Sequence, residues 1–187
     1  YVLELKSREY FLVSRLMSVL AHQDSLTGLH NRRSFDRVLA RLWRQAQREE
    51  RTLALLLCDV DHFKAYNDRY GHKAGDQALQ QVGAVLLEAA RRPLDLAVRL
   101  GGEEFLMVLV DTGSEGAQRV AEKLRKQVEQ ARFQLPRNQT QGVTISVGVA
   151  TFDGHPDYQR ILRQSDAALY RAKTAGRNRV QVAELEG

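Results

Sequence analysis

The sequence has little cysteine and proline, and it has no long apolar segment. Its 187 residues include one cysteine, Cys58, and three prolines. A single cysteine cannot form an internal disulfide, which excludes the small disulfide-stabilised secreted domains. No apolar run approaches the roughly 20 residues of a membrane-spanning helix, and the first residues lack the layout of a signal peptide. We therefore expect this region to be cytoplasmic and to make no membrane contact, even where the full-length protein carries an anchor upstream.

Aromatic residues are also scarce, at 7% of the chain. The net charge of +5 favours anionic partners. However, most arginines, such as Arg37 and Arg41, fall on predicted exposed helix faces rather than in a basic stripe interleaved with aromatics. We expect no nucleic-acid partner. The balance of 43% hydrophobic and 27% charged residues, together with the length, predicts one globular domain.

Residues 1–22 are predicted to form a helix with an approximate heptad seam. The seam consists of Val2, Leu5, Leu12, Leu16 and Val19, with Glu9 as the misfit. We interpret this segment as a signalling helix or linker that connects an upstream sensory domain to a catalytic domain at 23–187. The alternative is a helix folded back on the domain.

The rest of the chain alternates between helical and strand periodicity, which predicts an α/β fold with helices packed on a central sheet. Helices are predicted through 35–46, from Asp76 as N-cap to near Pro93, over 114–131 and through 161–172. Strands are predicted at 53–58, 95–100, 103–110, 143–149 and 179–183. The paired glycines Gly101 and Gly102 tolerate the positive φ of a tight turn, so 95–110 is predicted to be a hairpin.

Acidic residues flank the strand at 53–58 and this hairpin. Asp59 and Asp61 bracket Val60 at the strand end, and Glu103 and Glu104 leave the hairpin turn. An oxygen-only set that includes the Val60 carbonyl suits Mg²⁺, which often completes its coordination with substrate phosphates. The alternative is that these residues are solubilising charges at strand ends.

Two further groups of polar residues suit a nucleotide. Lys64 can stabilise phosphate charge, while Asn67 and Asp76, on either side of a glycine-containing loop, can read the donor edge of guanine. The alternative for Asn67 and Asp76 is turn and cap chemistry. Lys173 and Arg177 lie four residues apart and can clamp phosphates, although cations also favour a helix C-terminus through its dipole.

Five motifs, in order and spacing, resemble the diguanylate cyclase (GGDEF) family from about residue 22 to 182. They are DSLTGLHNRR, DVDHFKAYNDRYGHKAGD, RLGGEEF, TISVGVA and DAALYRAKTAGRNR, with GGEEF as a variant of the family signature. The resemblance implies a mostly antiparallel sheet flanked by helices, similar to adenylate cyclase and polymerase palm domains. It also implies metal-assisted condensation of two GTP molecules to cyclic di-GMP, with release of pyrophosphate.

The resemblance further implies roles for individual residues. Asp59, the Val60 carbonyl and Glu103 become metal ligands for Mg²⁺ or Mn²⁺, two ions per active half-site, with Glu104 near the second ion or the substrate. Glu103 becomes the catalytic base for the 3′-hydroxyl, and Lys64 stabilises the transition state. The substrate-binding residues become Asn67, His72, Asp76, Gly101, Gly102, Lys173 and Arg177. The role of Asp61 stays open, and His72 by itself is typical of a structural loop histidine.

Arg92 and Asp95 match the family's RxxD inhibitory site, nine residues before Gly101, which implies feedback by bound cyclic di-GMP. In isolation, an Arg-x-x-Asp pair is an ordinary helix-to-strand link. Because each chain supplies one guanine site and one phosphate grip, we expect a homodimer for catalysis. The alternative function is a catalytically inactive GTP or cyclic di-GMP receptor, which the intact signature and metal positions disfavour.

Overall fold

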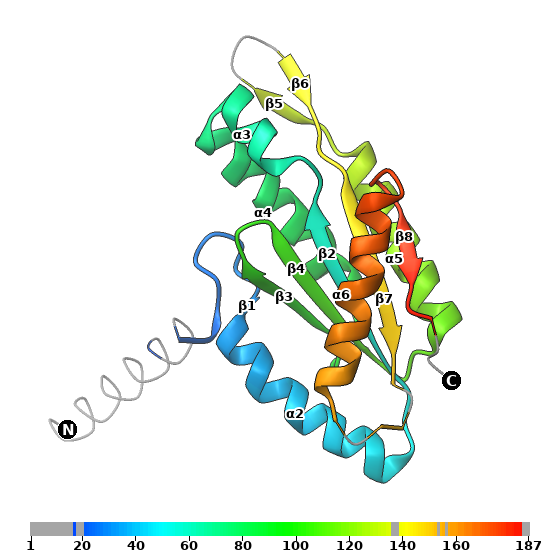
Figure 1. Ribbon diagram of the computed structural model, residues 1–187. Coiled ribbons are helices and arrows are strands. Elements are labelled where there is room, and N and C mark those ends of the chain that lie inside the picture. The colour runs from blue at the N-terminus through cyan, green and yellow to red at the C-terminus, as the bar shows by residue number, and fades with distance from the viewer. Residues whose placement is uncertain (1–16, 18–20, 136–138, 153, 156, 185–187) are drawn as a thin grey trace, which may run out of the picture.

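The centre of the molecule is a six-stranded sheet in the order β1-β3-β4-β2-β7-β8 (Figure 1). The computed structural model describes residues 17, 21–135, 139–152, 154, 155 and 157–184. The strands are β1 (His30–Asn31), β2 (Leu53–Val60), β3 (Leu96–Gly101), β4 (Glu104–Val110), β7 (Ile145–Thr151) and β8 (Val180–Val182). Pairing is antiparallel from β3 through β4 and β2 to β7, and parallel at both edges. The predicted mostly antiparallel sheet is confirmed, with parallel edge strands that make it mixed.

Helices cover both faces of this sheet. They are α2 (Arg32–Glu49), α3 (Phe63–Tyr70), α4 (His72–Ala89), α5 (Ser114–Gln130) and α6 (Gln159–Thr174). All eight residues of β2 are buried, and they alternate between the two layers. Leu55 packs in a cluster with Trp43 of α2 and Leu169 of α6, whereas Leu56 packs in a cluster with residues of α4 and α5. The apolar run of β2 therefore places Asp59, the second-to-last residue of the strand, at the edge of a core that is closed on both sides.

The segment between β2 and α4 differs from the prediction. We expected a glycine-containing loop with Asp76 as a helix N-cap, but α3 occupies Phe63–Tyr70 and α4 begins at His72. Only Gly71, with a φ of +89°, separates the two helices. The prediction of the cap was wrong because the buried face of α4 begins with the small residues Ala74, Gly75 and Ala78, which carry little hydrophobic signal. Asp76 lies inside α4 and is exposed.

Two short features were not predicted, and one prediction lies mostly outside the described residues. Strand β1 has two residues, and a separate hairpin of β5 (Phe133–Leu135) and β6 (Gln139–Gln141) lies beside α3 (Figure 1). Strands this short are below the length at which periodicity is visible. Of the predicted helix 1–22, the structure describes Met17, Ala21 and His22, all helical. Within the described part of the chain, no helix is long and apolar enough to cross a membrane.

Candidate active site

The acidic residues of the two motifs lie on neighbouring strands. In the register of β2 and β4, Asp59 is opposite Glu104, and the Val60 N–H donates to the Glu103 carbonyl oxygen at 3.1 Å. The end of β2 and the turn of the hairpin therefore meet at the same end of the central strands. This register is the geometric condition for Asp59, Val60 and Glu103 to serve a common ligand.

The hairpin that carries Glu103 has an irregular turn. Arg99 pairs with Phe105, whereas Gly101 pairs with Glu104, so Leu100 is an extra residue in β3. Gly101 and Gly102 have φ values of +141° and +53°, which favour glycine. Bulges of this type occur next to active sites because they change the direction of side chains at the end of a strand.

Asp59 has an unusual electrostatic environment. The whole residue is 7% exposed. Burial raises the pKa of its carboxyl group, and the nearby charges of Glu103 and Glu104 also raise it. The Lys173 ammonium, 3.0 Å from Asp59 Oδ2, opposes this shift. A buried carboxylate beside two further carboxylates is stabilised by a cation, and an all-oxygen set fits a hard divalent ion.

The side chains alone do not complete such a site. Among the residues that the structure describes, no group of three or more His, Cys, Asp or Glu side chains is arranged to hold a metal ion. An ion at Asp59 therefore needs additional oxygen ligands, such as a backbone carbonyl or the phosphates of a bound nucleotide.

The structure gives Asp61 a role that the sequence left open. Asp61 is 6% exposed, and its carboxylate accepts hydrogen bonds from the hydroxyls of Thr144 at 2.7 Å and Ser146 at 2.6 Å. It also accepts a bond from the backbone N–H of Asn178 at 2.9 Å. Asp61 thus joins the end of β2 to β7 and to the segment that follows α6. Nothing in the local pattern around Asp61 signals these partners, because they are distant in sequence.

The proposed base-reading residues lie on α3 and α4. Asn67 Oδ1 is buried and has no hydrogen-bond partner among the described residues. A Cβ added at Gly75 would lie 1.8 Å from this oxygen, so Gly75 provides the space that the amide occupies. A buried acceptor without a donor is costly unless a ligand supplies the donor. His72 at the start of α4 and Lys64 on α3 are both exposed.

Comparison with known proteins identifies the family. The model of the family described as "Diguanylate cyclase, GGDEF domain" matches residues 21–179. The chain belongs to the GGDEF domain family. It is 38% identical over 159 residues to diguanylate cyclase DosC of Escherichia coli (strain K12), covering 85% of this chain and 34% of DosC. This GGDEF chain therefore spans about a third of that relative's length.

Solved structures agree with this assignment. The coiled coil and GGDEF domain of DgcB from Caulobacter crescentus, in complex with c-di-GMP, has a TM-score of 0.89 at 32% identity, covering 97% of both chains. The active GGEEF domain of a diguanylate cyclase from Vibrio cholerae has a TM-score of 0.75 at 32% identity, covering 84% of this chain and 99% of that one. The predicted palm-like fold of the GGDEF family is confirmed by these likenesses.

The RxxD motif of this GGDEF domain lies at the other end of the hairpin strands. Asp95 directly precedes β3, and its backbone N–H donates to the Arg92 carbonyl at 3.0 Å. The Arg92 guanidinium is exposed and donates to the Val110 carbonyl at 3.2 Å, at the end of β4. The sheet therefore separates Arg92 and Asp95 from Asp59 and Glu103 by the length of β3 and β4.

Proposed function

We propose that this chain is the catalytic domain of a diguanylate cyclase, which condenses two GTP molecules into cyclic di-GMP and releases pyrophosphate. The observation that carries the proposal is the β2–β4 register, which sets Asp59 opposite Glu104 and bonds Val60 to Glu103. These are the positions at which the family resemblance expects the metal ligands and the catalytic base. The similarity to the active GGEEF domain supports the view that glutamate at position 103 is compatible with activity.

Each group of residues has a part in holding the substrate. Asn67 and Asp76, with His72 near the sugar, bind the guanosine end, and the free acceptor of Asn67 supports this assignment. The hairpin glycines Gly101 and Gly102 let the backbone approach the nucleotide, and Lys173 and Arg177 hold the phosphates. Asp59, the Val60 carbonyl and Glu103 would hold Mg²⁺ or Mn²⁺, with Glu104 beside a second ion. Such ions neutralise phosphate charge and make the α-phosphorus more electrophilic.

The reaction is a pair of in-line displacements. The 3′-oxygen of one GTP forms a bond to the α-phosphorus of the other as the bond from that phosphorus to the pyrophosphate oxygen breaks. The 3′-oxygen of the second nucleotide then attacks the α-phosphorus of the first in the same way, which closes the ring and releases a second pyrophosphate. Glu103 takes the proton from the 3′-hydroxyl. Lys64, Lys173 and Arg177 stabilise the negative charge that develops on the phosphate oxygens.

The stoichiometry requires two chains. One chain supplies one guanosine site and one phosphate grip, so two protomers related by a twofold axis present their GTP molecules to each other. We propose that residues 1–22 form the linker that pairs two domains at 23–187 and transmits a signal from an upstream sensory domain. The DgcB structure, which comprises a coiled coil and a GGDEF domain, supports this organisation. We also propose a cytoplasmic location, where GTP is available and the buried free thiol of Cys58 stays reduced.

The test is product formation from GTP with Mg²⁺, followed by separation of the nucleotides. The parent protein should form cyclic di-GMP, and Glu103→Gln should reduce the rate by at least about a hundredfold because the base is lost. Glu115→Gln, which changes a glutamate with a side chain 88% exposed at the start of α5, is the matched control and should keep parental activity. If the parent forms no product under dimeric conditions, the enzyme proposal fails. GTP binding by that inactive parent would identify the receptor alternative.

A further inference from the structure

The segment that follows α6 has an uncommon backbone. Gly176, Arg177 and Asn178 have consecutive φ values of +117°, +63° and +46°. Left-handed conformation is costly for arginine and better tolerated by asparagine, so a run of this kind persists only where surrounding contacts hold it. The structure shows which contacts hold this one.

The backbone of Asn178 is held from the sheet. Its N–H donates to Asp61 Oδ2 at 2.9 Å, and the Asp61 carboxylate is fixed by the hydroxyls of Thr144 and Ser146. Asp61 lies two residues after Asp59, on the same stretch of chain. The segment after α6 is therefore tied directly to the strand end that carries the proposed metal ligand.

The side chain of Asn178 is held from α5. Its Oδ1 accepts from Arg125 Nη1 at 2.7 Å, and its Nδ2 donates to Glu129 Oε1 at 2.7 Å. The side chain of Arg125 is 11% exposed and also pairs with Glu129 and Glu122. The bonds of Arg125 and Glu129 to the Asn178 amide are charge-assisted, which makes them stronger than bonds between neutral groups. Asn178 is therefore held through its side chain as well as through its backbone N–H.

This arrangement determines where Arg177 lies relative to Lys173. The Arg177 N–H donates to the Ala172 carbonyl at 3.0 Å, and the Gly176 N–H donates to the Lys173 carbonyl at 3.3 Å, which folds the segment back on the end of α6. Lys173 in turn contacts Asp59 at 3.0 Å. We infer that Asn178 is a positioning residue, which bridges Asp61 to Arg125 and Glu129. This bridge holds the phosphate-binding cations Lys173 and Arg177 at fixed positions relative to Asp59.

The inference rests on the proposed function and predicts a loss confined to the triphosphate. Asn178→Gly removes the side-chain bridge but keeps the backbone N–H and tolerates positive φ, and Arg125→Gln removes the charged partner on α5. Each should weaken binding of 3′-deoxy-GTP, which lacks the nucleophile and does not turn over, by about tenfold. Binding of GMP depends on the guanosine contacts and should change less than about twofold.

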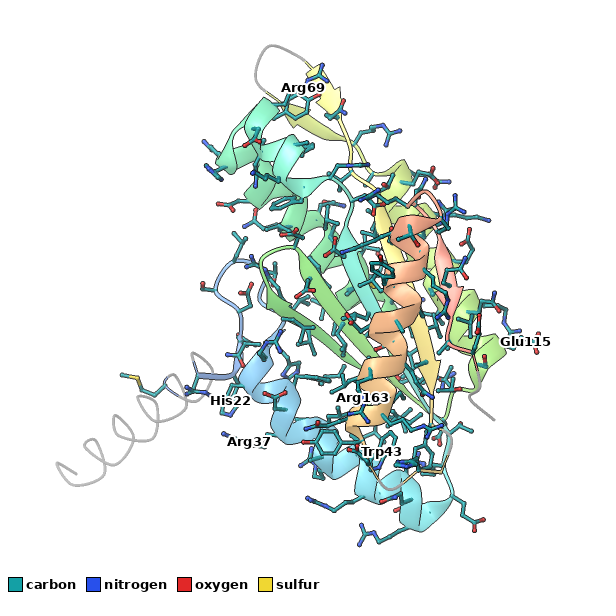
Figure 2. The ribbon with its side chains drawn as sticks, viewed as in Figure 1. His22, Arg37, Trp43, Arg69, Glu115 and Arg163 are labelled. Atoms are coloured by element: carbon teal, nitrogen blue, oxygen red, sulfur yellow. The ribbon has the colours of Figure 1, made fainter. Side chains whose placement is uncertain are left out.

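Arg119→Gln is the matched control, because Arg119 is another α5 arginine paired with a glutamate four residues away. Its partner, Glu115, lies at the far end of α5 from this network (Figure 2), and the control should bind both nucleotides like the parent. With GTP as substrate, the two test variants should raise KM more than they lower kcat.

Three outcomes would count against the inference. Parental affinity of Asn178→Gly for 3′-deoxy-GTP would overturn it alone, because the parent would still bind nucleotide and form product. Equal losses for 3′-deoxy-GTP and GMP, with a lower melting temperature, would mean that Asn178 serves the fold rather than the phosphates. A parent that neither bound 3′-deoxy-GTP nor formed cyclic di-GMP would overturn the proposed function, and with it this inference.

Discussion

The Lys173 ammonium forms an ion pair with the Asp59 carboxylate, with 3.0 Å between Nζ and Oδ2. The side chain of Asp59 is 10% exposed and that of Lys173 is 33% exposed, so the pair is partly shielded from water. The Lys173 ammonium, which is proposed to bind phosphate, thus contacts Asp59, which is proposed to bind the metal ion. A divalent ion would compete with Lys173 for the Asp59 carboxylate. We therefore expect ion binding to release the Lys173 ammonium toward the triphosphate.

Replacing Lys173 with methionine should leave Asp59 without its counter-charge. We expect Lys173→Met to lower the free energy of unfolding in metal-free buffer by about 1–2 kcal/mol, because a mostly buried carboxylate loses its partner. Added Mg²⁺ should then stabilise the variant more than the parent, and thermal unfolding with and without Mg²⁺ measures the difference. Lys126→Met, at an exposed lysine, is the control. Equal stabilisation of parent and Lys173→Met by Mg²⁺ would contradict the prediction.

A substitution at Gly75 tests the guanosine site without replacing any polar side chain. A Cβ at this position would lie 1.8 Å from Asn67 Oδ1, so Gly75→Ala should displace the Asn67 amide. We expect a loss of GMP affinity of about tenfold, since a buried hydrogen bond to the base is lost. Gly83→Ala in the same helix is the control, because its Cβ would meet Thr27 at 3.1 Å and not Asn67. Binding calorimetry with GMP would refute the prediction if Gly75→Ala bound as tightly as the parent.

Product feedback should depend on Arg92. Its side chain is exposed beside Asp95 and can present a guanidinium to a phosphate or a guanine edge. We expect Arg92→Ala to raise the cyclic di-GMP concentration for half-inhibition by at least about tenfold, with little change in the initial rate. Arg91→Ala removes the neighbouring exposed arginine, which pairs with Glu88, and should keep parental inhibition. Unchanged feedback in Arg92→Ala would remove this site from the proposed function.

The loop that precedes β1 should stabilise the hairpin in a pH-dependent way. Arg99 donates to the Gly102 carbonyl and pairs with Asp24 at 3.1 Å. Burial acts to raise the pKa of Asp24, but bonds from Thr27 and Arg99 outweigh it and leave the pKa lowered. A lowered pKa means that the folded state favours the ionised form. This stability is therefore present above the unfolded pKa of about 4 and is lost as the pH falls through the folded value.

Asp24→Asn should therefore be less stable than the parent at pH 7, by about 1–2 kcal/mol after allowance for partial solvent screening. The difference should narrow as the pH falls below about 4. Urea unfolding at pH 7 and pH 3 measures both values. Asp36→Asn, at an exposed carboxylate of α2, should differ little from the parent at either pH. A constant difference for Asp24→Asn at the two pH values would show that the carboxylate charge is not the cause.

The sequence by itself determined the helices and strands that have a strong hydrophobic periodicity. It also determined which acidic residues lie at the ends of those strands. The apolar run of β2 is buried along its whole length, and α5 ends within one residue of its predicted bound. Hydrophobic periodicity reports burial directly, because each element must turn its apolar side chains toward the core. The positions of Asp59 and Glu103 follow, since they flank a buried strand and a glycine turn.

Only the tertiary structure decided which distant residues meet. Asp61 and Asn178 are 117 residues apart, and the bridge from Asn178 to Arg125 crosses a further 53. The start of α4 at His72, in place of a cap at Asp76, was likewise set by packing of small residues. Hydrogen bonds between distant segments leave no periodic trace in either segment, and small residues add little apolar signal. Such contacts therefore become visible only when the sheet and its helices bring the segments together.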